Sequence, residues 1–270
     1  MGLAEDIDLV VERLESKLDP DSAASLRWLG SKLKNLALRR AISSNHTVME
    51  LVVAAYLLSK GYSVDAEREV APGLVCDLYA TKDDKTLVVE VETGFVPPEN
   101  SKDPIAYRFA RELSKVARYS KHADIFAMAV PPFHILQLPP LIFLPSAERR
   151  LWNLEAFKRI LDAYYARPPL ELDDLLSAKL HYVYVVLVDT LELIELTARE
   201  YFLTFVERPS ILMARNGWPP SWVGAEGEVS ATWSVATAPI TAQTGFASSP
   251  ASGGGAEFNG YRRAGSGHNF

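Results

Sequence analysis

Residues 73–94 read GLVCDLYATKDDKTLVVEVETG, and this stretch predicts a β-hairpin. In its first part, apolar residues that suit a buried core alternate with residues that would lie on the other face of a strand. Its last part is rich in β-branched side chains. The polar run Lys82–Lys85 between the two parts is typical of a turn. The two parts are therefore expected to pair as antiparallel strands.

The hairpin brings three acidic residues to one face of the sheet. With Asp83 and Asp84 at the centre of the turn, Asp77 lies directly opposite Glu90, and Glu92 projects from the same face. Opposed carboxylates repel one another, and clusters that offer only oxygen ligands suit Mg²⁺ and Mn²⁺. The three acids are therefore a candidate metal site. The alternative is a solvated strand face whose acids point to water.

The segment before the hairpin supplies a fourth carboxylate. Residues 47–60 read TVMELVVAAYLLSK and predict a helix that ends before Gly61. Its central residues are apolar except for Glu50, which indicates a buried helix. A buried carboxylate is costly unless it is paired, hydrogen-bonded or bound to metal. Glu50 is therefore a candidate ligand, unless it compensates the helix dipole or forms a capping box with Thr47.

The elements around the hairpin indicate an α/β fold. Residues 62–70 predict a strand before it, and residues 105–121 and 124–130 predict a helix and a strand after it. A helix, three strands, a helix and a strand in this order favour an α/β core.

Basic residues gather on two of the predicted helices. The helix at 105–121 carries them at steps of three and four, so that they form one stripe: Arg108, Arg111, Lys115 and Arg118. A helix at 22–42 carries Arg39 and Arg40. Lysine and arginine bind phosphates without reading sequence, so the five arginines are candidate nucleic-acid contacts. A solvated basic helix face is the alternative.

The chain is expected to contain four parts. They are an N-terminal helical arm (1–43), the α/β core (44–135), an extension of helices and strands packed on the core (136–216) and a low-complexity, disordered tail (217–270). Within the extension we expect helices at 147–165 and 172–180 and a strand at 182–188. Residues 191–206 fit either strands or a helix, and their threonine and aromatic content favours strands.

Composition narrows the class of protein. The chain has 270 residues, of which 48% are hydrophobic and 23% charged, as in ordinary globular proteins. Its formal charge of −6 gives no overall attraction to nucleic acid, so such binding must depend on local basic patches.

The single cysteine, Cys76, excludes an internal disulfide and a zinc site built from several cysteines. No apolar run approaches the length of a membrane span and the N-terminus is not signal-like, so we expect a soluble, cytoplasmic protein without a membrane partner.

The set formed by Glu50, Asp77 and Glu90-Val91-Glu92 resembles the PD-(D/E)xK nuclease superfamily, which includes restriction endonucleases and archaeal Holliday junction resolvases. In that superfamily an acid on a helix precedes the Asp, and (Asp/Glu)-x-Lys follows on the next strand, before a helix and a further strand. The similarity covers roughly residues 44–132. It implies a restriction-endonuclease-like core, in which helices flank a mixed central sheet, with the N-terminal helical arm and an α+β C-terminal extension.

The resemblance also implies an activity. Its members hydrolyse phosphodiester bonds with Mg²⁺ or Mn²⁺, so we expect a DNA nuclease, selective for branched or nicked structures and active as a homodimer. Asp77 and Glu90 would bind the metal directly, Val91 would lend its carbonyl oxygen, and Glu50 would bind a second metal or the water of the first.

Two positions depart from the superfamily pattern. Cys76 precedes Asp77 in place of the proline, a departure that is common in the superfamily. Glu92 stands where most members have a lysine, and it would act as general base or hold a second metal. Lys115 is the candidate for the missing cation. The alternative function is a catalytically weakened nuclease-fold module that binds nucleic acid or serves in assembly. We interpret His46 as a polar residue at the entry of the helix that carries Glu50, and His134 as incidental.

Overall fold

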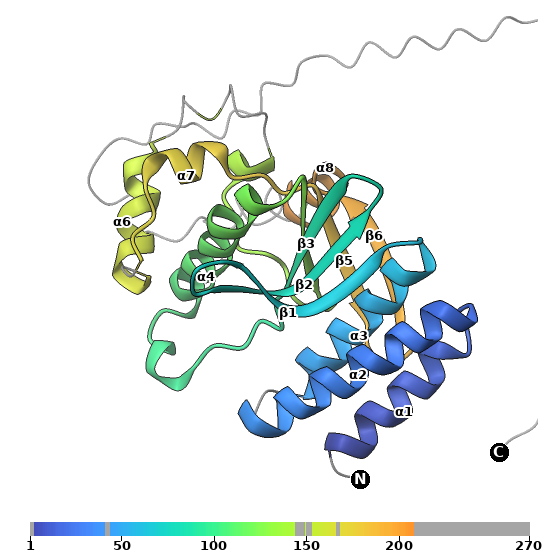
Figure 1. Cartoon of the computed structure of the whole chain (residues 1–270). Coiled ribbons are helices and arrows are strands. Elements are labelled where there is room, and N and C mark those ends of the chain that lie inside the picture. The colour runs from blue at the N-terminus through green and yellow to red at the C-terminus, as the bar shows by residue number, and fades with distance from the viewer. Residues whose placement is uncertain (1–2, 41–43, 144–148, 150–152, 166–167, 208–270) are drawn as a thin grey trace, which may run out of the picture. The chain divides into compact units, whose positions relative to one another are not determined.

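The computed structural model describes residues 3–40, 44–143, 149, 153–165 and 168–207. Within them six strands form one sheet whose strand order follows the chain order (Figure 1). The strands are β1 (Ser63–Ala71), β2 (Leu74–Lys82), β3 (Lys85–Val91), β4 (Ile125–Val130), β5 (Tyr182–Leu187) and β6 (Glu192–Thr197). The strands β3, β4 and β5 run parallel, and the pairs β1–β2, β2–β3 and β5–β6 are antiparallel. The sheet is therefore mixed, and the expected α/β class is confirmed.

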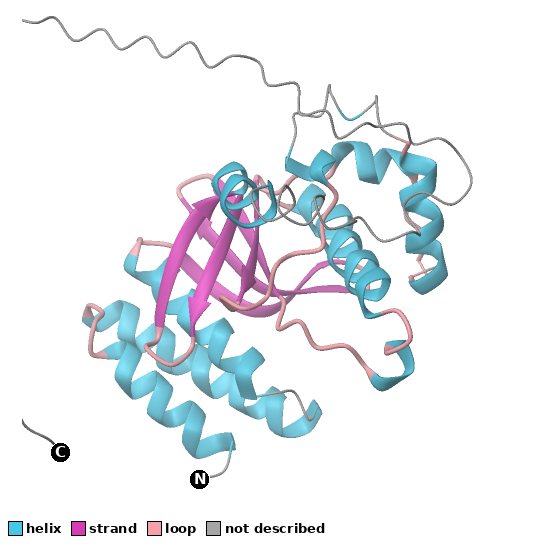
Figure 2. Ribbon diagram, turned by 180° about the vertical axis from the view of Figure 1, so that it is seen from behind, coloured by secondary structure: helices cyan, strands magenta, loops and turns pink. Residues whose placement is uncertain are grey.

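Helices cover both faces of this sheet (Figures 1 and 2). One face packs against three N-terminal helices: α1 (Leu3–Glu15), α2 (Pro20–Arg40) and α3 (Ser44–Ser59). The other face packs against α4 (Pro104–Tyr119), α6 (Leu154–Tyr164), α7 (Leu172–Ser177) and α8 (Ala198–Tyr201). Short 3-10 turns lie at Pro98–Asn100, Ser120–His122 and Pro140–Phe143, and Phe202–Glu207 forms a π-helix.

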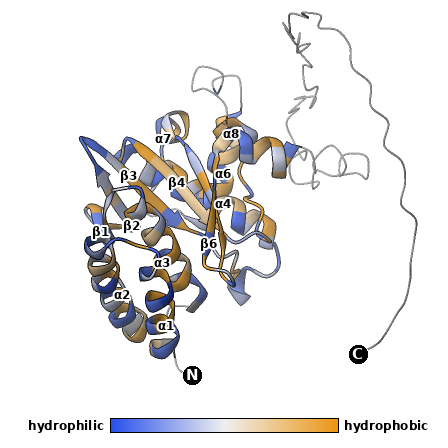
Figure 3. Ribbon diagram, turned by 90° about the vertical axis from the view of Figure 1, so that its right-hand side faces the viewer, coloured by the Kyte–Doolittle hydropathy of each residue, from blue (hydrophilic) through white to orange (hydrophobic). Residues whose placement is uncertain are grey.

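The two-residue alternation of β3 decides which helix its acidic residues face. Leu87, Val89 and Val91 pack with the N-terminal helices, whereas Val88 packs with α4. Glu90 lies on the side of Val88 and therefore projects toward α4. Figure 3 shows apolar residues on the central strands and hydrophilic residues along the outer sides of α1 and α2.

The predicted register of the hairpin is confirmed. The pairs run from Lys82 with Lys85 to Leu78 with Val89, as expected for a turn centred on Asp83 and Asp84. The helix expected at 105–121 and the strand expected at 182–188 are also present, with slightly shorter bounds.

Two local expectations are wrong. The helix α3 begins at Ser44, so Thr47 lies inside it and cannot be the N-cap of a capping box with Glu50; His46 likewise lies within the helix and not before it. The segment 191–206 is a strand only over β6, because Thr197 then caps a helix by accepting a hydrogen bond from the backbone N–H of Glu200.

The extension after residue 135 continues the central sheet. Strand β5 pairs with β4, and α6 packs on α4, so the described residues belong to one compact unit. The expected tail, 217–270, lies outside the described residues. None of the helices described is long and apolar enough to cross a membrane.

Candidate active site

Asp77 and Glu90 lie where the backbone pairing of β2 and β3 ends. The last ladder pair is Leu78 with Val89, and beyond it the acidic side chains bond to backbone groups of the neighbouring strand. The N–H of Val91 donates to Oδ2 of Asp77 at 2.6 Å, and the N–H of Asp77 donates to Oε1 of Glu90 at 3.2 Å. These bonds fix both carboxylates at the end of the hairpin.

A lysine from α4 meets these carboxylates. Nζ of Lys115 lies 3.1 Å from Oε2 of Glu90 and 3.7 Å from Oδ2 of Asp77, and it donates to the carbonyl oxygen of Val91 at 2.9 Å. Burial opposes the charged form of Lys115, but the surrounding acids outweigh it and hold its pKa well above the ordinary value. Lys115 is therefore a fixed cation within the cluster.

Glu92 anchors this lysine. Its Oε1 lies 2.7 Å from Nζ of Lys115, and Nε of Arg111 donates to both of its oxygens at 2.9 and 3.0 Å. Burial disfavours its charged form, but Lys115 and Arg111 outweigh that effect and lower the pKa of Glu92. Glu92 is thus an ionised, doubly paired carboxylate.

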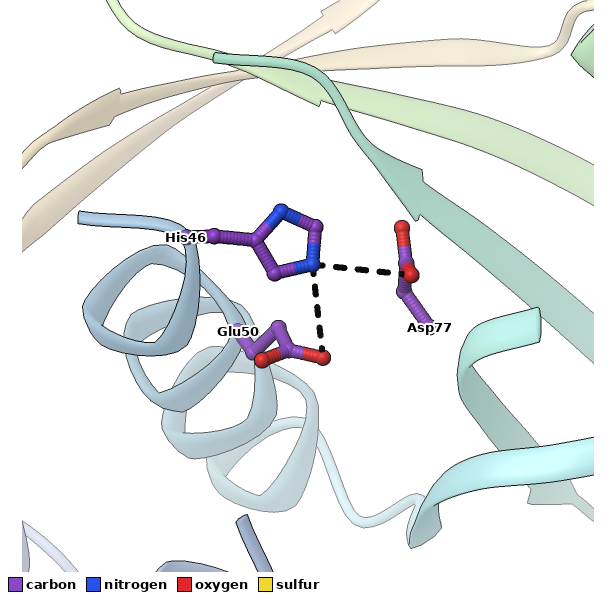
Figure 4. A group of neighbouring side chains, drawn as sticks. All are labelled: His46, Glu50 and Asp77. Atoms are coloured by element: carbon purple, nitrogen blue, oxygen red, sulfur yellow. Dashed lines mark ion pairs between the residues drawn. The ribbon is translucent and has the colours of Figure 1, made fainter. Parts of the chain in front are cut away.

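A second group lies on the α3 side of Asp77 (Figure 4). Nε2 of His46 is 3.5 Å from Oδ1 of Asp77 and 3.7 Å from Oε1 of Glu50, and one ligand atom from each residue lies within 4.8 Å of the others. His46 and Glu50 are four positions apart, so they share one face of the helix. Oε1 of Glu50 is buried and has no hydrogen-bond partner. A buried, unpartnered carboxylate oxygen is the kind of atom that a cation would satisfy.

Another acid, Glu67 of β1, contributes to the charge of the cluster. It has a φ of 50°, and it lies at the position where the β1–β2 pairing skips from Ala66 to Arg68. Burial raises the pKa of Glu50 most, and the charges of Asp77 and Glu67 raise it further. A non-glycine residue in the left-handed region often marks a functional site.

The described residues of the cluster include more carboxyl groups than cations. The cations Lys115 and Arg111 lie among five acidic residues: Glu50, Glu67, Asp77, Glu90 and Glu92. Burial and the charge of Asp77 raise the pKa of Glu90 to about 8, whereas Lys115 and His46 overcome the effect of burial and lower the pKa of Asp77. Glu50 and Glu90 therefore hold their protons more tightly than ordinary carboxyl groups do.

The candidate nucleic-acid contacts are distributed differently. Arg111 binds Glu92, and the other two arginines of the α4 stripe bind backbone carbonyls: Arg108 that of Ile135 at 2.7 Å, and Arg118 that of Pro168 at 2.7 Å. The side chains of Arg39 and Arg40 lie outside the described residues. Contact with nucleic acid stays a prediction for all five.

His134 has a structural role that its sequence position does not indicate. Its Nε2 lies 2.9 Å from Oε1 of Glu112, a fully buried acid of α4, and Arg108 reaches its Nδ1 at 2.9 Å. Gly94 passes so close to the ring that a Cβ atom there would lie 2.4 Å from Nδ1. This network holds the loop after β4 and the turn after Glu92 against α4.

The structure thus brings together Glu50, Asp77, Glu90, Glu92 and Lys115, all of which were expected in the site. Sequence reasoning missed His46 and Glu67. The four-residue spacing from His46 to Glu50 was an available signal, but it counts only if the helix begins before residue 46. Glu67 gives no such signal, because it lies within a polar run of a predicted strand.

Comparisons with known proteins found no relative of this chain. Neither protein-family models, nor curated proteins, nor solved structures gave a match.

Proposed function

We propose that this protein is a metal-dependent nuclease that hydrolyses phosphodiester bonds in DNA, with a restriction-endonuclease-like core over residues 44–135. The observation that carries the proposal is the convergence of Asp77, Glu90 and Lys115 at the end of β3, with both carboxylates within 3.7 Å of the lysine's ammonium group. This is the set of groups that the resemblance to PD-(D/E)xK nucleases implies, with the lysine supplied by α4.

The cluster fits a divalent cation. It offers an orphaned buried oxygen on Glu50, a second carboxylate on Asp77 and more carboxyl groups than cations. The cation class that carboxylates prefer includes Mg²⁺ and Mn²⁺. When bound, such an ion polarises a phosphoryl oxygen and supplies a water of lowered pKa.

The residues of the chain supply the remaining functions. Lys115, held by Glu92 and by the carbonyl oxygen of Val91, places a fixed positive charge beside the cation ligands, where it stabilises negative charge that develops on the phosphate. Glu92 positions that lysine. We do not assign it the role of general base, because Arg111 occupies both of its oxygens. The phosphate contacts proposed for Arg39 and Arg40, and the homodimer, are part of the same proposal.

The test is cleavage of labelled single-stranded, duplex, flap and four-way-junction DNA with Mg²⁺ or Mn²⁺. Asp77→Asn and Glu90→Gln should each lower the rate by two or more orders of magnitude, on the order of what loss of a charge-stabilising group costs. Asp84→Asn, in the exposed turn of the same hairpin, is the matched control and should cut at the normal rate. Cleavage that survives in both site variants would refute the proposed site.

A binding module without catalysis is the second candidate. Lys115 already pairs with Glu90 and Glu92 and donates to the carbonyl oxygen of Val91. This candidate is favoured because the ammonium is fully engaged within the protein. On this view the cluster is a structural ion network. A folded protein that binds DNA and cuts none of the four substrates with either metal would support it.

A further inference from the structure

Asp77 divides the cluster into two unlike halves. Its Oδ2 faces the N–H of Val91 and the ammonium of Lys115, and its Oδ1 faces His46. The two halves therefore share one carboxylate but offer different partners to a cation.

The first half already contains a cation. Nζ of Lys115 is surrounded by Oδ2 of Asp77, Oε2 of Glu90 and the carbonyl oxygen of Val91, at 3.7, 3.1 and 2.9 Å. These are the oxygens that would otherwise be offered to a directly bound metal ion. Because Glu92 and Arg111 hold the lysine from behind, the ammonium cannot leave this position without unpairing Glu92. The ammonium therefore occupies the position that a metal ion bound to these oxygens would need.

The second half lacks a cation and contains a nitrogen ligand. Nε2 of His46, Oε1 of Glu50 and Oδ1 of Asp77 converge within 4.8 Å, and Figure 4 shows the ring nitrogen pointing at both carboxylates. The side chain of Glu50 is only 1% exposed, and its Oε1 has no hydrogen-bond partner. Imidazole suits first-row transition metals, whereas Mg²⁺ prefers oxygen ligands alone.

We propose that the chain binds one divalent first-row transition-metal ion, for which Mn²⁺ is the probe, through His46, Glu50 and Asp77, and that the ammonium of Lys115 permanently takes the place of a second ion. The inference deepens the proposed function, because it names the class of metal and the stoichiometry of that same site. It can nevertheless be tested without cleavage.

The experiment is isothermal titration calorimetry of the full chain with Mn²⁺ and with Mg²⁺. We expect one Mn²⁺ per chain, bound on the order of tenfold more tightly than Mg²⁺, because the imidazole discriminates between the two ions. His46→Asn should weaken Mn²⁺ binding by on the order of tenfold or more and change Mg²⁺ binding little. His122→Asn, at the far end of α4, is the control and should titrate like the unmodified protein.

Substitution of Lys115 tests the second part of the inference. Lys115→Gln removes the ammonium and should raise the stoichiometry from one Mn²⁺ to two, because it opens the Asp77–Glu90–Val91 half. Since this variant also unpairs buried acids, its fold is checked by circular dichroism. If it does not fold, the number of Mn²⁺ ions in the unmodified protein, counted by electron paramagnetic resonance, decides the same point.

The outcomes separate this inference from the proposed function. Two ions in the unmodified protein, equal affinities for Mn²⁺ and Mg²⁺, or unchanged Mn²⁺ binding by His46→Asn would each overturn the inference, whether or not DNA is cut. One tightly bound Mn²⁺ that depends on His46, in a protein that cuts no DNA, would sustain the inference and overturn the nuclease.

Discussion

The ammonium of Lys115 lies 2.7 Å from Oε1 of Glu92, so a residue of α4 is paired with an acid that directly follows β3. The hairpin supplies the carboxylate and the helix supplies the cation. Arg111, one turn before Lys115 on the same helix, holds the other side of that carboxylate. The geometry of the site therefore depends on how α4 packs on the sheet.

Loss of the Lys115 charge should be costly to the fold. Lys115→Met leaves Asp77, Glu90 and Glu92 without their shared partner, and breaking a buried ion pair on one side costs about 3–5 kcal/mol of unfolding free energy. Urea denaturation measures this loss. The control is Lys121→Met, whose more exposed ammonium pairs with Asp174 and should cost less than about 1 kcal/mol. Equal losses in the two variants would show that the cluster does not stabilise the fold through Lys115.

The close approach of Gly94 to His134 should make the turn after Glu92 intolerant of a side chain. Gly94 and Gly73 both have positive φ, 79° and 72°, but a Cβ at Gly73 would meet no atom within 4 Å. Gly73→Ala should therefore cost only the left-handed backbone, about 1–2 kcal/mol. Gly94→Ala should cost about 1–3 kcal/mol more, because the methyl group displaces the imidazole. Thermal unfolding of the two variants side by side gives the difference, and a Gly94→Ala protein no less stable than Gly73→Ala would contradict the observed packing.

Glu112 should make stability depend on pH. Burial raises its pKa above the ordinary value of 4.5, against the opposing effect of His134. A carboxyl group with a raised pKa binds more protons in the folded state than in the unfolded state, so its stabilising contribution is complete below pH 4.5 and is lost as the pH rises toward neutral.

Glu112→Gln should therefore gain stability relative to the unmodified protein as the pH rises from 4.5 to neutral, by at most about 1.4 kcal/mol per pH unit. Urea titrations across that range measure the difference between the two proteins. Glu12→Gln, on the exposed side of α1, is the control and should keep a constant difference. If the difference in unfolding free energy between Glu112→Gln and the unmodified protein stayed constant, Glu112 would ionise equally easily in the folded and unfolded states.

The parts of the site that sequence predicts are those fixed by local pattern. The turn sequence sets the register of the hairpin, which places Asp77 beside Glu90, and the apolar run around Glu50 establishes its burial. The rest depends on tertiary geometry. The start of α3 decides whether His46 faces the site, and the left-handed backbone of Glu67 has no signal in its sequence.

The basic stripe of α4 illustrates the same limit. Its four members lie at equivalent helical spacing, yet Lys115 and Arg111 face the acids whereas Arg108 and Arg118 bind carbonyl groups of the loops after β4 and α6. The sequence has no periodic pattern that predicts the paths of those loops. The stripe itself could therefore be predicted, but the groups that its members bind could not. In structural terms the stripe joins α4 to three separate segments.

The order of the strands has a consequence for how the molecule is made. Each strand pairs with the one that precedes it in the chain, so every step of sheet growth joins neighbours in synthesis. The candidate site lies within residues 46–115, and its sheet platform is complete once β4 has paired with β3. Every residue of the candidate site therefore leaves the ribosome before any residue of β5 or β6.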